Sequence, residues 1–243
     1  MIRVGVIGHA GRMGAETCRT VEADAELELV ARVGRGDDLA GLVDAGAGVV
    51  VDFTTPQTVK EDVHFCVTHS IHAVVGTSGL SGDDLKEIEG WLEGTDVNVI
   101  VAPNFALGAV LMMSFAATAA RYFDTAEIVE RHHERKLDSP SGTSLRTADL
   151  MNEARSEPWV TTADTGSTAG SRGTEREGLR IHSLRLPGSV AHQEVILGGH
   201  GETLTIRHDS LDRSSFMPGV VLAIKKVPSL DGLVVGLEHL LDR

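Results

Sequence analysis

The chain has 243 residues, of which 42% are hydrophobic, enough to bury the core of one large domain or two modest ones. Its formal net charge of −13 argues against nucleic acids and anionic membranes as partners, because binding to phosphate groups depends on Lys and Arg. The N-terminal apolar run is too short for a signal peptide and no stretch reaches the roughly 18 apolar residues of a membrane span, so we expect a cytoplasmic protein.

The chain begins with a β-rich run, a glycine-rich turn (GHAGRMG, residues 8–14) and a predicted helix over residues 15–25. Gly8 allows a tight turn, Gly11 lets a pyrophosphate approach the backbone, and Gly14 permits close packing of helix on strand. The spacing GxxGxxG is a weak motif alone, but its place between strand and helix favours dinucleotide binding. The predicted cofactor contacts here are Gly8, His9, Ala10, Gly11, Arg12 and Met13.

Four further short apolar runs alternate with helix-like stretches, at Leu27–Val33, Gly48–Phe53, Ala73–Gly76 and Asn98–Ala102. This alternation predicts a Rossmann-type, doubly wound parallel α/β sheet, whose ligand crevice lies beyond the carboxyl ends of the strands. Polar tails follow three of these strands and should converge on that crevice. From two of the tails we predict cofactor contacts at Gly76, Thr77, Ser78, Ala102, Pro103, Asn104 and Phe105.

Cofactor choice is usually set about 20 positions beyond the glycines, where an acidic residue binds the ribose of NAD. Here residues 33–36 read VGRG. Without a carboxylate at that point, and with Arg35 beside Gly34, the site is predicted to accept NADPH and/or NADH, with NADPH favoured. The alternative is a solvated surface arginine.

The densest chemistry lies in the segment EIVERHHERKLDSPSGTS, residues 127–144. An apolar alternation before it, turn residues within it and a helical pattern over residues 145–154 predict a strand-to-helix loop. His132 and His133 titrate near neutrality, Lys136 is a cationic donor, and the new helix N-terminus can receive an anion. The combination suits an enzyme that protonates an anionic substrate.

The pattern then changes to a second α+β, mostly antiparallel-sheet domain. Its predicted parts are an Ala-rich helix at 106–122, a mobile loop at 156–178, and antiparallel strands within 181–207 that turn at Pro187–Gly188 and Gly198–Gly201. A helical segment at 214–226 is expected to return to the first domain. The predicted division is therefore residues 1–104 plus 214–243 for dinucleotide binding, and residues 105–213 for substrate binding and oligomerisation.

No metal site is predicted, because the histidines of the second domain lack ligand partners at zinc-site spacing. Cys18 and Cys66 also lack such spacing and are expected to be reduced structural thiols.

These motifs together resemble one family, 4-hydroxy-tetrahydrodipicolinate reductase, long called dihydrodipicolinate reductase, of the diaminopimelate route to lysine. The family signature is matched by Glu127, Ile128, Glu130, His132, Lys136, Asp138, Pro140, Ser141, Gly142 and Thr143, with Ser144 replacing an alanine. Similar stretches are VVVDFTTP (49–56), GTSG (76–79), APNFALGAVL (102–111) and the run at 191–220. Gly34 departs from the acidic residue of many members, whereas Arg35 matches an arginine that some members use for NADPH.

The resemblance implies reduction of a cyclic imine with two carboxylates by hydride from NAD(P)H, with loss of water. It implies proton donation by His132 and Lys136, a substrate contact at His133, and carboxylate binding by Gly142 and Thr143. It also implies a homotetramer. Ligands held by two domains should close around hinges near Phe105 and Asp212.

Two other functions remain open from the sequence alone. One is an imine or aldehyde reductase with another substrate. The other is a dinucleotide-sensing module, which should lack the proton-donating loop.

Overall fold

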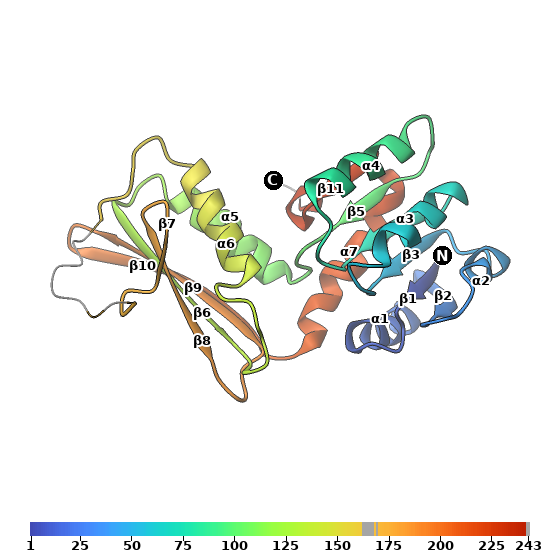
Figure 1. Ribbon diagram of the computed structural model, residues 1–243, viewed down its shortest axis with the longest axis horizontal. Coiled ribbons are helices and arrows are strands. Elements are labelled where there is room, and N and C mark those ends of the chain that lie inside the picture. The colour runs from blue at the N-terminus through green and yellow to red at the C-terminus, as the bar shows by residue number, and fades with distance from the viewer. Residues whose placement is uncertain (162–167, 169, 242–243) are drawn as a thin grey trace. The chain divides into compact units, whose positions relative to one another are not determined.

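The computed structural model describes residues 1–161, 168 and 170–241. The chain divides into two compact units (Figure 1). Unit 1 comprises Met1–Leu107 and Phe216–Arg243, and unit 2 comprises Gly108–Ser215. In the described residues, no helix is both long and apolar enough to cross a membrane.

Unit 1 is built on a six-stranded parallel sheet with the order β11-β5-β4-β3-β1-β2. The strands are β1 (Ile2–Ile7), β2 (Leu27–Val33), β3 (Val49–Asp52), β4 (His72–Val75), β5 (Val99–Val101) and β11 (Leu233–Val235). The chain winds first to one side of β1 and then to the other, so the strand order reverses between β1 and β3. This confirms the predicted doubly wound sheet.

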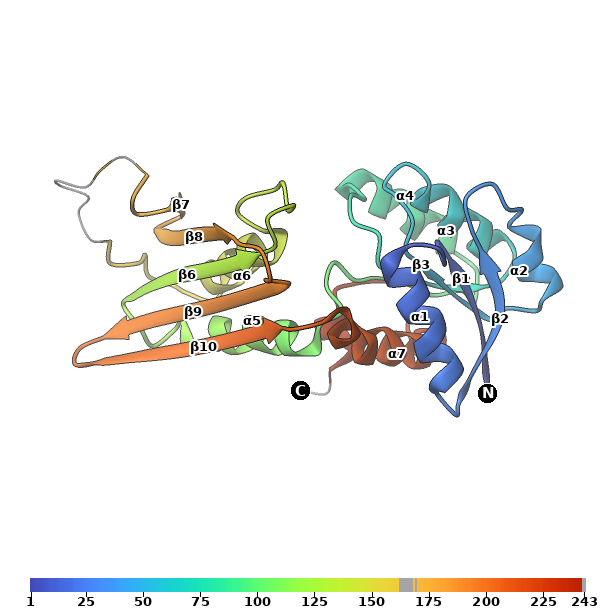
Figure 2. The ribbon, with the colours of Figure 1, turned by 90° about the horizontal axis from the view of Figure 1, so that it is seen from below.

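Helices cover both faces of this sheet. They are α1 (Arg12–Ala23), α2 (Ala40–Asp44), α3 (Val59–Thr68), α4 (Gly82–Leu92) and α7 (Met217–Lys226). Figure 2 shows α1 and α7 below the sheet and α3 and α4 above it. Strands covered on both faces are apolar without alternation, as in the fully buried run VVVD of β3. That is why these strands stand out in the sequence.

Strand β11 was not predicted. It has three residues and pairs in parallel with β5 at the edge of the sheet. A run this short carries no measurable periodicity, so only its neighbours in space identify it as a strand. The expected helix at 214–226 is present as α7 and packs against α1.

Unit 2 is a five-stranded mixed sheet with the order β10-β9-β6-β8-β7. The strands are β6 (Thr125–His132), β7 (Thr174–Arg176), β8 (Leu179–Arg185), β9 (Ala191–Gly199) and β10 (Glu202–Ser210). Of the strand pairs described in this sheet, only β6 and β8 are parallel. Helices α5 (Leu107–Ala119) and α6 (Gly142–Glu153) pack on one face through side chains such as Ala116, Ile128 and Met151. In the described part of the chain, no helix covers the opposite face, here called the open face (Figure 2).

Three expectations for this unit were wrong in detail. Strands β8 and β9 are not neighbours, because β6 lies between them and pairs with both, although the chain does turn at Pro187–Gly188. The supposed mobile loop at 156–178 contains β7 and the buried Trp159, whose Nε1 donates to Asn152 Oδ1 over 2.7 Å. Its residues 162–167 and 169 lie outside the described residues. Finally, β6 continues through His132, so this histidine belongs to the strand.

Candidate active site

Glu130 is the centre of a charged network at the end of β6. Its carboxylate is fully buried, and Oε2 lies 2.5 Å from Nδ1 of His132. Arg185, on β8, donates to both carboxylate oxygens over 2.8 and 2.9 Å. Since Nδ1 of His132 faces a carboxylate, Nε2 is left as the ring atom that can exchange a proton with a ligand.

The charge state of Glu130 follows from these contacts. Burial by itself raises the pKa of this carboxyl, but hydrogen bonds from His132, Arg185 and Ser183 outweigh burial and lower the pKa to about 2. Glu130 is therefore ionised at neutral pH, and it can orient an imidazole and stabilise the imidazolium form.

The loop after β6 is tied to the same arginine. Arg185 donates to the backbone carbonyls of Lys136 and Asp138 over 3.3 and 2.6 Å. Lys136 Nζ contacts both carboxylate oxygens of Asp138 at 2.8 and 2.7 Å, and this contact lowers the pKa of Asp138. The two predicted proton donors, His132 and Lys136, are thus held by one scaffold.

Helix α6 begins at Gly142, with Ser141 as its N-cap. The Ser141 hydroxyl accepts from the amide of Ser144 over 3.2 Å, and the amide of Ser141 donates to Glu130 Oε1 over 3.2 Å. Gly142 and Thr143 form the start of the first turn, at the end of the helix whose dipole attracts anions. A substrate carboxylate could bind there.

His133 lies next to this network, outside β6. Its Nδ1 is buried without a hydrogen-bond partner, and burial, followed by the charge of Arg135, lowers its pKa. The ring is therefore a mostly neutral group, suited to hydrogen bonding with a ligand.

In unit 1, the glycine-rich turn joins β1 to α1. Gly8 has a φ of +80°, and a Cβ on Gly14 would lie 2.2 Å from the carbonyl oxygen of Gly8, so both positions require glycine. Gly11 is the N-cap of α1 and supplies no side-chain cap, which leaves the first-turn amides of Arg12 and Met13 to an external anion. The turn fits a pyrophosphate group.

The other predicted cofactor loops meet around Phe53. A Cβ on Gly8 would lie 2.3 Å from the Phe53 carbonyl, and one on Gly76 would lie 2.1 Å from the Phe53 ring. The Phe53 and Phe105 rings pack edge to face at 5.8 Å. Loops after β1, β3, β4 and β5 therefore lie together at the carboxyl edge of the sheet. Among the predicted cofactor contacts in these loops, the exposed ones are Ala10, Gly11, Ser78 and Pro103, and the buried ones are Thr77, Ala102 and Phe105.

The turn after β2 contains a carboxylate, Asp37, that the sequence pattern did not single out. Asp37 accepts from the amide of Gly34 over 2.8 Å. A Cβ on Gly34 would also lie 3.2 Å from Nε2 of His9, which places this end of β2 beside the glycine-rich turn. Arg35 is exposed.

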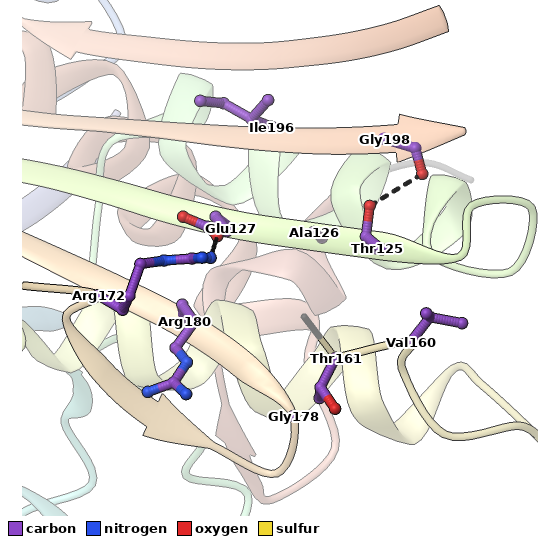
Figure 3. Close-up of a pocket in the computed structure, with 10 residues that line it drawn as sticks. All are labelled: Thr125, Ala126, Glu127, Val160, Thr161, Arg172, Gly178, Arg180, Ile196 and Gly198. Atoms are coloured by element: carbon purple, nitrogen blue, oxygen red, sulfur yellow. Dashed lines mark hydrogen bonds and ion pairs between the residues drawn. The ribbon is translucent and has the colours of Figure 1, made fainter. Parts of the chain in front are cut away.

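A cavity of about 330 Å³ lies elsewhere in unit 2, beside Thr125, Ala126 and Glu127 (Figure 3), which form the opposite end of β6 from His132. It is lined by residues that include Thr125, Glu127, Arg172 and Arg180, and none of the predicted site residues lines it. Among the described residues, no group of His, Cys, Asp and Glu side chains could hold a metal ion.

Sequence reasoning missed the roles of Glu130 and Arg185. Glu130 occupies an inward position of β6, after Ala126 and Ile128, where alternation predicts an apolar side chain. A carboxylate at such a position, two residues before a histidine on the same face of the strand, was the available signal. Nothing local in the sequence identifies Arg185 as its partner.

Two protein-family descriptions match consecutive parts of the chain. The family described as "Dihydrodipicolinate reductase, N-terminus" matches residues 2–105, and "Dihydrodipicolinate reductase, C-terminus" matches residues 108–241. The chain is 52% identical to the 4-hydroxy-tetrahydrodipicolinate reductase of Streptomyces griseus and 49% identical to that of Mycolicibacterium smegmatis. Both alignments cover 99% of this chain. They cover 98% of the Streptomyces griseus protein and 99% of the Mycolicibacterium smegmatis protein.

Among solved structures, the chain is similar to the dipicolinate-bound dihydrodipicolinate reductase of Paenisporosarcina sp. TG-14. The TM-score is 0.90 at 39% identity, over 99% of this chain and all of the other. An amine dehydrogenase from Mycobacterium smegmatis shares the fold, with a TM-score of 0.68 at 14% identity.

Proposed function

The chain belongs to the dihydrodipicolinate reductase family, and we propose from this that unit 1 binds the reduced nicotinamide cofactor while unit 2 binds and protonates the substrate. The protein is an oxidoreductase that reduces 4-hydroxy-tetrahydrodipicolinate, with NAD(P)H as reductant, in lysine biosynthesis. The cofactor supplies the hydride. This chain's residues position the reactants and supply protons.

The network around Glu130 carries the assignment of the proton donor. Reduction of a conjugated ring leaves an electron pair on the ring system, which must be protonated. We assign this step to Nε2 of His132, because Glu130 fixes the opposite ring nitrogen and stabilises the protonated imidazole. Lys136, held by Asp138, is the second donor.

The substrate's carboxylates are assigned to the start of α6. The backbone amides of Gly142 and Thr143 and the Thr143 hydroxyl would bind one carboxylate, with His133 as a further substrate contact. The uncapped start of α1 and the loops around Phe53 would hold the dinucleotide.

A coupled assay tests this function. A dihydrodipicolinate synthase fed with pyruvate and aspartate semialdehyde generates the substrate, and oxidation of NADPH or NADH is followed by absorbance. We expect oxidation that depends on the synthase. Tight NADPH binding without oxidation would contradict the proposal and would favour another imine substrate or a sensor.

For the cofactor, we propose a preference for NADPH. Arg35 is exposed beside Gly34 and carries the charge that a 2′-phosphate requires, whereas Asp37 is already engaged with the Gly34 amide.

For assembly, we propose a homotetramer, as the resemblance implied, and we further propose that its subunits meet through the open face of the unit 2 sheet. The support in this chain is that partly buried apolar side chains such as Val129 and Ile196 lie on a face that no described helix covers. Light scattering should give four times the 25.8 kDa chain mass, and Ile196→Lys should give smaller species. A wild-type monomer would contradict this.

We also propose a cytoplasmic location. The two cysteines, Cys18 and Cys66, are both unpaired and buried, as suits a reducing compartment. Fractionation of cells that express the chain would test this.

A further inference from the structure

A pair of buried aspartates lies behind the cofactor loops of unit 1. Asp52 ends β3 and is 2% exposed, while Asp62 lies on α3 and is 9% exposed. The two side chains interact directly, and two buried carboxylates in contact cannot both be ionised without a large cost in free energy.

One oxygen of Asp52 organises two loops. Oδ1 accepts from the amide and the hydroxyl of Thr54, over 3.0 and 2.8 Å, and from the hydroxyl of Thr77, over 2.7 Å. The amide of Thr54 also donates to Thr77 Oγ1 over 2.8 Å. Asp52 thus joins the loop after β3 to the loop after β4.

The other oxygen, Oδ2 of Asp52, is buried and has no hydrogen-bond partner. Asp62 is the neighbouring group that can supply one, because its side chain interacts with Asp52 and is also within 3.4 Å of the Thr54 hydroxyl. A proton on Asp62 would give Oδ2 its missing donor. A single proton on Asp62 would therefore explain both why Oδ2 of Asp52 has no other donor and how a second carboxylate can be buried beside it.

The surroundings favour that proton. Burial, then the charge of Asp52 and the hydrogen bond with it, raise the pKa of Asp62 to about 7. Glu61 adds further negative charge, and Lys60 on the same helix is paired with Asp84 and Glu87 instead. Burial also raises the pKa of the Cys66 thiol, so this neighbour stays neutral.

We propose that Asp62 is a positioning residue whose shared proton, donated to Oδ2 of Asp52, keeps the loops at Thr54 and Thr77 in place for the dinucleotide, so that cofactor affinity falls when this proton is lost. The inference rests on the proposed cofactor site in unit 1. It adds a pH dependence of cofactor affinity, and the group responsible is distant in sequence from the proposed proton donors of unit 2.

The test is NADPH binding without substrate, measured by fluorescence titration from about pH 6 to pH 8.5. Binding that needs a group with a pKa near 7 weakens as pH rises above it, so we expect the wild-type Kd to rise about tenfold or more over this range. Asp62→Asn keeps a donor to Oδ2 and cannot titrate, so it should retain its acid-side affinity throughout. Asp83→Asn, on the exposed face of α4, should behave like the wild type.

A flat wild-type profile, or the same slope in Asp62→Asn, would overturn the inference. Infrared spectroscopy gives a second readout that needs no cofactor. The carbonyl band of a protonated carboxyl should be present near pH 6 in the wild type and missing in Asp62→Asn, and its absence from the wild type would also overturn the inference. Failure of NADPH to bind at any pH would instead count against the proposed function.

Discussion

Glu130 and His132 form a hydrogen-bonded pair at the end of β6, with 2.5 Å between Oε2 and Nδ1. The carboxylate is fully buried and is neutralised by Arg185, so it remains ionised while it fixes the histidine ring. Because this pairing occupies Nδ1, Nε2 is the ring nitrogen of His132 that can exchange a proton with a ligand.

Replacing the histidine tests its role as acid. His132→Gln should lower kcat by about 10²-fold or more, with little change in NADPH affinity, because general acid catalysis typically contributes that much. Steady-state kinetics in the coupled assay would measure it. His200→Gln, in the exposed turn between β9 and β10, is the control. Wild-type turnover in His132→Gln would rule out this donor.

Replacing the carboxylate tests the orientation of the ring. Glu130→Gln preserves the shape but offers an uncharged group to His132 and Arg185, so we expect kcat to fall about tenfold or more with a smaller change in KM. Glu134→Gln, at a more exposed carboxylate, should leave both constants unchanged. An equal loss in the two variants would show that the effect is not specific to the network.

Glu130 should also make the protein sensitive to acid. Its folded-state pKa of about 2 lies below the ordinary value of 4.5, so its contribution to the free energy of unfolding is complete above about pH 4.5 and is lost as pH falls toward 2. The shift corresponds to about 3 kcal/mol. The stability difference between wild type and Glu130→Gln, measured by urea unfolding, should shrink over that interval. A constant difference would contradict this prediction.

The glycine-rich turn makes a steric prediction. Gly14→Ala would place a Cβ 2.2 Å from the Gly8 carbonyl oxygen, so the turn must move; we expect lower thermal stability and weaker NADPH binding. Gly90→Ala is the matched control, because its helical position has nothing within 4 Å. It should be neutral or more stable, by up to about 1 kcal/mol. Equal effects would show that the close approach at Gly14 is unimportant.

The choice between NADPH and NADH is tested at Arg35, which follows β2. If Arg35 binds the 2′-phosphate, Arg35→Ala should lower kcat/KM for NADPH about tenfold and leave kcat/KM for NADH nearly unchanged. Lys86→Ala, on the exposed surface of α4, controls for the loss of positive charge. A parallel decrease for both cofactors would remove the basis for a preference at this position.

The parallel sheet of unit 1 was predictable because its strands are buried on both faces and its glycine turn is local. The apolar runs of β1 to β5 and the order strand, turn and helix at residues 2–23 are visible without a structure. So is the chemical content of the loop that contains Lys136. Periodicity could not identify β11, which has three residues, nor could it show that β6 lies between β8 and β9.

The amino-acid sequence by itself determined the fold class, the family resemblance and the residues able to donate protons, because each depends on local pattern or residue type. Tertiary structure alone decided which donors meet the buried carboxylates. Arg185 reaches Glu130 across 55 positions, and Thr77 reaches Asp52 across 25. The physical reason is that a buried carboxylate must find its donors in space, and strand pairing brings those donors from distant parts of the chain.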